Sequence, residues 1–424
     1  MARLRFVHAA DLHLDSPFTG LRTVEPAIAG ALQEATFDAF SNIIELCVSE
    51  RVDALLIAGD IFDGADRSLR AQLKFVDGLN RLSNAGIRSF VCHGNHDPLN
   101  GWEARLAFPE GSHRFAAEVE GFPVFADDPG RSMVYGISYP RREVRENLVP
   151  RFGGVERGPF NIALLHANVD SDPAHEAYAP CSLGDLERTA AIDYWALGHV
   201  HTRRVLRETG PSIVYPGNPQ GRHPNERGPR GVYLVEVSDS GQVHLDFRPV
   251  DVVRWARLEL DISGLEAEQS LFDRLEQELA TRRDQADGRS TLFRLVLGGR
   301  GPLHHSLIRP GFVDDLLERI NETGSQERPF FWCERIQVST ASLIDREQER
   351  HRGDFVGDLV RLRDEWQKTP NCLGEIRENL QELYGRGNAG RFLREHLPTD
   401  EELLELMAGA EAACLAELLE EDNA

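Results

Sequence analysis

Five short segments of the chain carry side chains that bind divalent metal ions well, and an apolar run precedes each of them. The candidate ligands are carboxylate, amide and imidazole groups: Asp11, His13, Asp60, Asn95, His166, His199 and His201. The apolar runs indicate strands, and they are Phe6–Val7, Ala54–Ala58, Phe90–Val91, Ile162–Leu165 and Tyr194–Leu197. Side chains at the carboxyl ends of buried strands meet at one edge of a sheet in open α/β folds. The sequence therefore predicts a metal centre at such an edge.

The mixture of ligand types favours a pair of cations. Two ions roughly 3.5–4 Å apart need a shared carboxylate, and Asp60, which lies between the outer segments on a glycine turn, is the best bridging candidate. The other ligands are then expected to form two sets: Asp11, His13 and His201 for one ion, and Asn95, His166 and His199 for the other. His199 and His201 share one face if the segment is extended, whereas a bend would direct them to neighbouring ions. The glycines before Asp60, Asn95 and His199 allow positive φ and close approach of the backbone.

His96 is the candidate for proton transfer, because it follows the proposed ligand Asn95 and remains free of metal. Asp97 is expected to orient the His96 ring, since a catalytic imidazole is usually held by a carboxylate or a carbonyl. His96 and Asp97 are therefore the predicted catalytic residues.

The elements that position these residues follow from the periodicity of the apolar side chains. Helical spacing over Ala27–Glu50 and Ser68–Ala85 predicts helices between the first three strands. Ser212–Tyr215, Gly231–Val237 and Val243–Arg248 are predicted strands, separated by turns rich in glycine and proline. This pattern indicates an α/β domain built as a layered β-sandwich with flanking helices.

The pattern changes after a boundary near Val250–Val253. It predicts a β-α-β-α-β unit, a small α+β domain, with the elements Val253–Leu260, Leu265–Arg283, Thr291–Leu297, Phe312–Ile320 and Phe330–Val338. From about Phe355 only helices are predicted. The last one, Asp400–Glu420, has an apolar stripe that either packs in a core or docks to a partner. The predicted domains are therefore 1–250, 251–345 and 346–424.

Composition is that of an ordinary globular protein. The chain has 424 residues, of which 41% are hydrophobic and 27% charged, and this length exceeds that of a usual single domain. Six cysteines without a CxxC pair indicate a reducing cytoplasm. Polar residues interrupt the first apolar run, so no signal peptide is expected, and no apolar run approaches the roughly 20 residues of a membrane span. Neither Lys74 nor Lys368 fits a P-loop, so the sequence has no Walker A motif.

The net charge of −22 is unfavourable for binding DNA, so a local basic surface would be required. The best candidate is Arg203–Arg230, in which six arginines stand against Glu208 and Glu226. Arginine suits bidentate contact with phosphate, and the alternative is an ordinary solvated loop. The predicted nucleic-acid contacts in this segment are Arg222, His223 and Arg227.

The five ligand segments resemble the motifs of the calcineurin-like metallophosphoesterases. Two stretches, His8–Pro17 (HAADLHLDSP) and Gly217–His223 (GNPQGRH), are more narrowly similar to the SbcD-like DNA repair exonucleases, particularly the YhaO-like branch. The resemblance implies a four-layer sandwich, the same ligand assignments, and contact between His96 and the scissile phosphate. Some family members carry a histidine three residues after the bridging aspartate, where this chain has Asp63.

The function implied by this resemblance is two-metal-dependent cleavage of DNA phosphodiester bonds by activated water. Mn²⁺ is the expected metal, because mixed nitrogen and oxygen ligands disfavour pure Mg²⁺ sites and the resemblance supports it. Residues 251–345 are expected to cap the nuclease and shape access of DNA. A separate SbcC-like ATPase of the ABC/SMC type is the expected partner of the terminal helices, with a homodimer as the alternative.

Two other functions stay open on sequence alone. The same site could serve a phosphatase or a small-molecule phosphodiesterase. Protein phosphatases of this superfamily usually carry Gly-Asp-x-x-Asp-Arg-Gly and Gly-Asn-His-Glu, whereas this chain has Gly64 after Asp63 and ends its third motif with Asp97. The third function is a non-catalytic scaffold that binds DNA ends, but a scaffold needs no His96.

Overall fold

The structure, a computed structural model, describes most of the chain: residues 4–21, 25–64, 68–101, 106–170, 176, 178–326, 328–368, 372–385 and 399–421. It divides into two compact units. The first contains the chain up to Leu258 together with Leu279–Leu295 and Leu316–Ile336. The second contains Glu259–Glu278, Val296–Asp315 and the chain from Gln337 onward.

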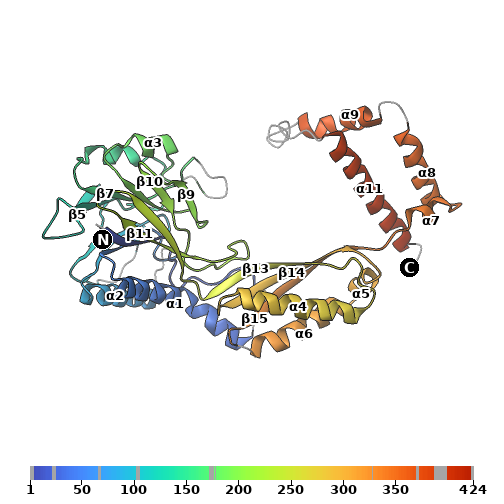
Figure 1. The fold of residues 1–424 in the computed structure, drawn as a ribbon, viewed down its shortest axis with the longest axis horizontal. Coiled ribbons are helices and arrows are strands. Elements are labelled where there is room, and N and C mark those ends of the chain that lie inside the picture. Colours follow the sequence, from blue (N-terminus) through green and yellow to red (C-terminus); the bar gives the residue numbers. More distant parts are fainter. Residues whose placement is uncertain are drawn as a thin grey trace. The chain divides into compact units, whose positions relative to one another are not determined.

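The first unit, most of which is the blue-to-green part of the ribbon in Figure 1, contains a six-stranded sheet in the order β12-β11-β1-β2-β3-β4. The strands are β1 (Leu4–Ala9), β2 (Ala54–Ala58), β3 (Arg88–Cys92), β4 (Ser112–Arg114), β11 (Gly231–Val237) and β12 (Val243–Pro249). Strands β1 to β4 are parallel, whereas β11 is antiparallel to β1 and β12 to β11. The carboxyl ends of β1, β2 and β3 therefore lie at the same edge of the sheet.

A second six-stranded sheet has the order β5-β6-β7-β8-β10-β9. Its strands are β5 (Glu120–Pro123), β6 (Ser132–Gly136), β7 (Phe160–His166), β8 (Tyr194–Gly198), β9 (Arg204–Arg207) and β10 (Ser212–Tyr215). Strands β6, β7, β8 and β10 are parallel, and the edge strands β5 and β9 are antiparallel to their neighbours. His166 is paired with Gly198, so β7 and β8 end at the same level.

Alternate residues of the central strands enter different cores, because successive side chains of a strand point to opposite faces. In β2, Ala54, Leu56 and Ala58 pack between the two sheets, whereas Leu55 and Ile57 pack with the helical layer beside the first sheet. The second sheet likewise has one face between the sheets and one covered face. Strands buried on both faces must be apolar throughout, which explains the continuous apolar runs of the sequence.

Helices on the outer faces complete four layers. Helices α1 (Pro26–Glu50) and α2 (Leu69–Asn84) cover the first sheet, and the 3₁₀ helix η1 (Val149–Gly154) and α3 (Leu183–Arg188) cover the second. Pro26 lies at the start of α1, where its missing N–H costs nothing. The Ser68 side chain caps α2 by accepting a hydrogen bond from the Ala71 N–H. The predicted four-layer α/β sandwich is confirmed.

The chain after the sandwich forms a three-stranded sheet in the order β13-β14-β15. The elements are β13 (Val253–Asp261), α4 (Glu268–Gln285), β14 (Ser290–Arg300), α5 (His304–Leu307), α6 (Phe312–Gln326) and β15 (Phe331–Ala341). The predicted α+β unit is confirmed, and α5 is a short addition to it.

The remaining described elements are helices: α7 (Arg346–Arg350), α8 (Phe355–Gln367), α9 (Cys372–Gly385) and α11 (Asp400–Glu421). A small core joins Val356 and Val360 of α8 with Leu415 of α11. The predicted helical C-terminal region is therefore confirmed. Among the helices that the structure describes, none has the length and apolarity needed to cross a bilayer.

Candidate metal centre

The predicted ligands lie at the carboxyl ends of strands from both sheets. The first sheet contributes Asp11, His13, Asp60 and Asn95, and the second contributes His166, His199 and His201. The sequence suggested a site at the edge of one sheet, but the structure forms it between two sheets. Strands β2 and β7 face each other so closely that the His166 Nδ1 lies 2.9 Å from the Ala58 carbonyl oxygen. Periodicity within single strands contains no signal for this face-to-face packing.

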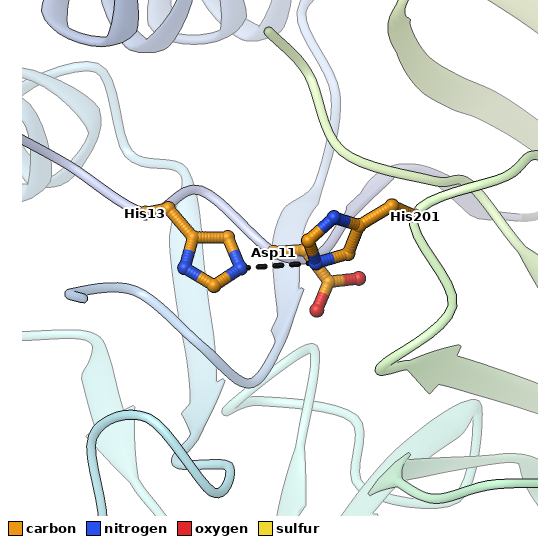
Figure 2. A group of neighbouring side chains, drawn as sticks. All are labelled: Asp11, His13 and His201. Atoms are coloured by element: carbon orange, nitrogen blue, oxygen red, sulfur yellow. Dashed lines mark hydrogen bonds between the residues drawn. The ribbon is translucent and has the colours of Figure 1, made fainter. Parts of the chain in front are cut away.

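One group of side chains consists of Asp11, His13 and His201. A carboxylate oxygen and two imidazole nitrogens all lie within 4.8 Å of one another. Figure 2 shows the rings of His13 and His201 directed toward each other, with the Asp11 carboxylate beside the His201 ring. The two Nε2 atoms are 3.1 Å apart. These are the three side chains that the sequence assigns to one ion.

A second group consists of Asp11, Asp60 and His166, and all three side chains are buried. The His166 Nε2 lies 3.2 Å from an Asp60 carboxylate oxygen and 3.0 Å from the Asn95 side-chain oxygen. The same Asp60 oxygen lies 4.0 Å from the His13 Nε2. Asp60 is thus located between the two groups, as a bridging carboxylate would be.

His199 is placed differently from the other predicted ligands. Its backbone N–H donates to the Asp11 carboxylate, and its ring lies 5.2 Å from the His166 ring between centroids. Its Nε2, however, lies 2.9 Å from the backbone oxygen of Glu176. Ligation of an ion by His199 would therefore have to use Nδ1.

The donor atoms fit divalent cations, because lone pairs face lone pairs in the pocket. The His166 Nδ1–H donates to Ala58, so its Nε2 directs a lone pair at the oxygens of Asp60 and Asn95. Such an arrangement requires a proton or a metal ion between the atoms. Burial alone would lower the pKa of His166, but the Asp60 carboxylate outweighs it and raises the pKa to about 9. Without metal, a proton thus occupies the position of a cation.

The pKa of His13 is shifted in the opposite direction to that of His166. Burial, together with the nearby charge of Arg222, lowers the pKa of His13 to about 3. The ring is therefore neutral at physiological pH, and a metal-ligating imidazole must be neutral. The residues present thus fit a pair of divalent ions.

The backbone at the ligands is strained. Four non-glycine residues have positive φ: Asp11 (52°), His13 (43°), Asp60 (49°) and His199 (103°). Conformations of this kind cost about 1–3 kcal/mol each and cluster at functional sites. The sequence suggested positive φ and close backbone approach at the neighbouring glycines; Gly59 has positive φ (88°), whereas Gly94 and Gly198 allow close approach. A Cβ atom at Gly94 would lie 2.3 Å from an Asp60 oxygen, and one at Gly198 would lie 1.8 Å from the Ala58 oxygen.

His96 lies at the mouth of the pocket with its side chain 35% exposed. Its Nδ1 donates to the Asp63 carboxylate at 2.6 Å, and its backbone N–H donates to Asp60 at 2.9 Å. Burial lowers the pKa of His96, but Asp63 and Asp60 outweigh burial and raise it above its ordinary value. His13, Asp63 and His96 form a third group with donor atoms within 4.8 Å of one another.

Asp97 does not have the place that the sequence suggested. Its buried carboxylate accepts hydrogen bonds from the His93 Nδ1 at 3.0 Å and from the Gly94 N–H at 2.8 Å. It also accepts the Ile61 N–H at 2.9 Å. The carboxylate beside His96 belongs to Asp63, whereas Asp97 is directed at its own segment and at Ile61. The sequence marked the position of Asp63, three residues after Asp60, but not its pairing with His96.

The three predicted DNA contacts are in different surroundings. The Arg222 side chain is only 12% exposed, and its guanidinium contacts Ser16 and the Asp63 carboxylate, the latter at 3.2 Å. His223 and Arg227 are exposed. One residue of the same segment was missed as a contributor to the site: Glu226, whose carboxylate accepts a hydrogen bond from the His201 Nδ1 at 2.6 Å. The only sequence signal for Glu226 was a negative charge within a segment rich in arginine.

Comparison with known proteins gives two family matches. Residues 4–203 match the calcineurin-like phosphoesterase family, and residues 255–341 match the middle domain of metallophosphoesterase YhaO. The chain is 37% identical to the uncharacterized metallophosphoesterase YhaO of Bacillus subtilis strain 168, over 93% of this chain and 94% of that protein. It is 25% identical to the DNA double-strand break repair protein Mre11 of Sulfurisphaera tokodaii, over 71% of this chain and 75% of that protein.

Among solved structures, a dimetal phosphatase from Danio rerio aligns with 59% of this chain and 97% of its own at 13% identity. The TM-score is 0.38, which is too low to support an argument about function.

Proposed function

The chain belongs to the calcineurin-like metallophosphoesterases, in the branch that contains YhaO, and from this membership we propose that it is a two-metal phosphodiesterase that cleaves DNA. Membership in this family makes it a phosphoester hydrolase with candidate metal ligands. The DNA substrate is the proposed refinement. It is supported by the 25% identity to a protein named for DNA double-strand break repair and by the SbcD-like segments of the sequence.

The observation that carries the proposal is the position of Asp60 between two groups of donors. Asp60 has one oxygen near both His13 and His166. We assign one ion to Asp11, His13 and His201, the other to Asn95, His166 and His199, and the bridge to Asp60. Two such ions supply an activated water and offset charge on the phosphoryl oxygens. We propose Mn²⁺, which accepts mixed nitrogen and oxygen ligands.

His96 is proposed to protonate the departing oxygen or to stabilise the phosphoryl group. The Asp63 carboxylate holds the Nδ1–H, so exchange of a proton takes place at Nε2. Despite burial, the Asp63 and Asp60 carboxylates raise the pKa of His96, which favours the role of a proton donor. Asp63, in place of Asp97, orients the ring. Asp97 contributes indirectly, because it holds the Gly94 N–H in the loop that carries Asn95 and His96.

The chain beyond the nuclease domain 1–250 is proposed to serve DNA access and assembly. We assign residues 251–345 to a domain that shapes DNA access and residues 346–424 to a region that docks a partner. Support for the middle domain comes from the YhaO middle-domain match at residues 255–341. We propose a separate SbcC-like ATPase as the partner, with a homodimer as the alternative.

Metal-stripped protein supplied with Mn²⁺ provides the test. The substrates are duplex DNA, single-stranded DNA, bis(p-nitrophenyl) phosphate and the monoester p-nitrophenyl phosphate, and the control is Asp60→Asn. The proposal predicts that wild type cleaves DNA and the diester far faster than the monoester, and that Asp60→Asn cleaves none of them. Cleavage of the monoester alone would identify a phosphatase. DNA binding without any cleavage would identify the scaffold.

A further inference from the structure

Glu226 lies in the segment between β10 and β11, and each of its carboxylate oxygens contacts a different part of the pocket. One oxygen accepts the His201 Nδ1–H at 2.6 Å. The other accepts the Arg222 backbone N–H at 2.7 Å. The side chain is 15% exposed, so water competes little for these two hydrogen bonds.

The contact with His201 determines which ring nitrogen faces the pocket. Because Nδ1 carries the proton that Glu226 accepts, Nε2 presents its lone pair. That Nε2 is the atom 3.1 Å from the His13 Nε2, and it lies within the group that includes Asp11. A carboxylate behind a ligating histidine orients the ring and increases its basicity.

The contact with Arg222 connects Glu226 to Asp63 and His96. Glu226 holds the Arg222 backbone, and the Arg222 guanidinium lies 3.2 Å from one Asp63 oxygen. The other Asp63 oxygen accepts the His96 Nδ1–H at 2.6 Å. A continuous series of contacts therefore runs from His201 through Glu226, Arg222 and Asp63 to His96.

The backbone around Glu226 is firmly anchored. The Gln220 side chain donates to the Val253 carbonyl at 2.6 Å and accepts the Val252 N–H at 3.0 Å. The Gly228 N–H donates to the Trp255 carbonyl at 3.0 Å. These contacts fix both ends of the segment 220–228 to the start of β13. The carboxylate thus has a defined place from which to hold its two partners.

We propose that Glu226 is a positioning residue, which holds His201 in the orientation that ligates metal and, through Arg222 and Asp63, holds His96. The inference rests on the proposed two-metal function. It predicts two separable effects: weaker binding of the one ion that His201 ligates, and slower diester cleavage through His96.

The experiment compares Glu226→Gln with wild type and with Glu208→Gln. The control removes the same charge from the same basic segment at a residue outside the pocket. Mn²⁺ binding to the metal-stripped full-length protein is measured by titration calorimetry, and folding by thermal melting. We expect Glu226→Gln to bind one ion about 10–100-fold more weakly and the other ion as wild type does. Glu208→Gln should bind both ions as wild type does.

Arg222→Ala tests the second effect. It leaves the Glu226–His201 contact intact and removes a positive charge near His13, so neither ion should bind more weakly, while cleavage of bis(p-nitrophenyl) phosphate slows. Glu226→Gln that binds both ions as wild type does would overturn the inference, as would equal weakening of both ions with a lowered melting temperature. Wild type that binds two Mn²⁺ but cleaves no diester would instead overturn the proposed function and leave the positioning role standing.

Discussion

The pocket of the sandwich and the C-terminal helices differ in what they bury and what they expose. The pocket buries ionisable side chains: Asp11, Asp60 and His166 are at most 1% exposed. The helices place their charges in surface pairs, such as Arg350 with Glu347. They also expose large apolar side chains: Phe355 (68%) and Leu362 (63%), both on α8.

Buried ionisable side chains and exposed apolar side chains both cost free energy, and each kind indicates a different binding partner for its region. Buried carboxylates are costly unless they are paired or coordinate metal, so the pocket needs cations. Exposed apolar side chains gain free energy when another surface covers them, which suits the docking role that we propose for the helices. Chemistry and association should therefore be separable by mutation.

The largest effect is expected from Asp60→Asn. Asp60 has an oxygen near both His13 and His166, so loss of its charge should weaken both ions. The loss of diester cleavage should exceed the roughly 10–100-fold that outer-shell partners of metals cost. Metal analysis after dialysis should find less than one ion per chain. A variant that keeps both ions would show that Asp60 is no bridge.

The next largest effect is expected from His96→Ala. His96 is held by Asp63 rather than by the two ligand groups, so both ions should stay bound. Loss of proton transfer should slow diester cleavage roughly 10²–10⁴-fold. Rates and metal content are compared with those of His351→Ala, a histidine on the exposed end of α7. A His96→Ala protein without metal would make His96 a ligand instead.

A smaller effect, on the salt dependence of DNA binding, is expected from Arg227→Ala and should distinguish it from Arg222→Ala. Arg227 is exposed, whereas the Arg222 guanidinium is paired with Asp63. Each phosphate contact contributes about −0.9 to the slope of log K against log salt. Arg227→Ala should therefore flatten the salt dependence of DNA binding by about 0.9, and Arg222→Ala should change it less. Equal slopes for Arg227→Ala and wild type would make this segment a solvated loop.

The smallest effect on catalysis is expected from removal of the C-terminal helices. A truncation within this region, for example near Gly353, would split a set of paired helices, because Arg346 on α7 is paired with Asp364 on α8 and Glu411 on α11. Truncation after Ser342 therefore removes the whole set of paired helices. Cleavage of bis(p-nitrophenyl) phosphate should change less than about 2-fold, which corresponds to about 0.4 kcal/mol. Binding to a partner or to a second copy should be lost in a pull-down or in sedimentation. Unfolding, or loss of diester cleavage, would place the helices in the catalytic part of the molecule.

The fold and the ligand positions were predictable because both follow from local sequence. Strands buried on two faces have continuous apolar runs in the sequence, and Asp11, Asp60 and Asn95 each lie shortly after the end of such a strand. The pairing of Asp63 with His96 and of Glu226 with His201 was not predictable, since these contacts span 33 and 25 residues. No periodicity specifies contacts between loops. Because sequence patterns do not reveal contacts between loops, the sequence neighbour Asp97 was expected beside His96 in place of Asp63.

The central claim is that the pocket needs two divalent ions to cleave phosphodiester bonds. The most direct measurement adds Mn²⁺ stepwise to metal-stripped wild type and records bound metal and DNA cleavage in the same samples. The account predicts that cleavage follows the fraction of chains that hold two ions, so cleavage lags behind total bound metal and is complete only at two ions per chain. Full cleavage with one ion bound, or cleavage that survives removal of all metal, would contradict it.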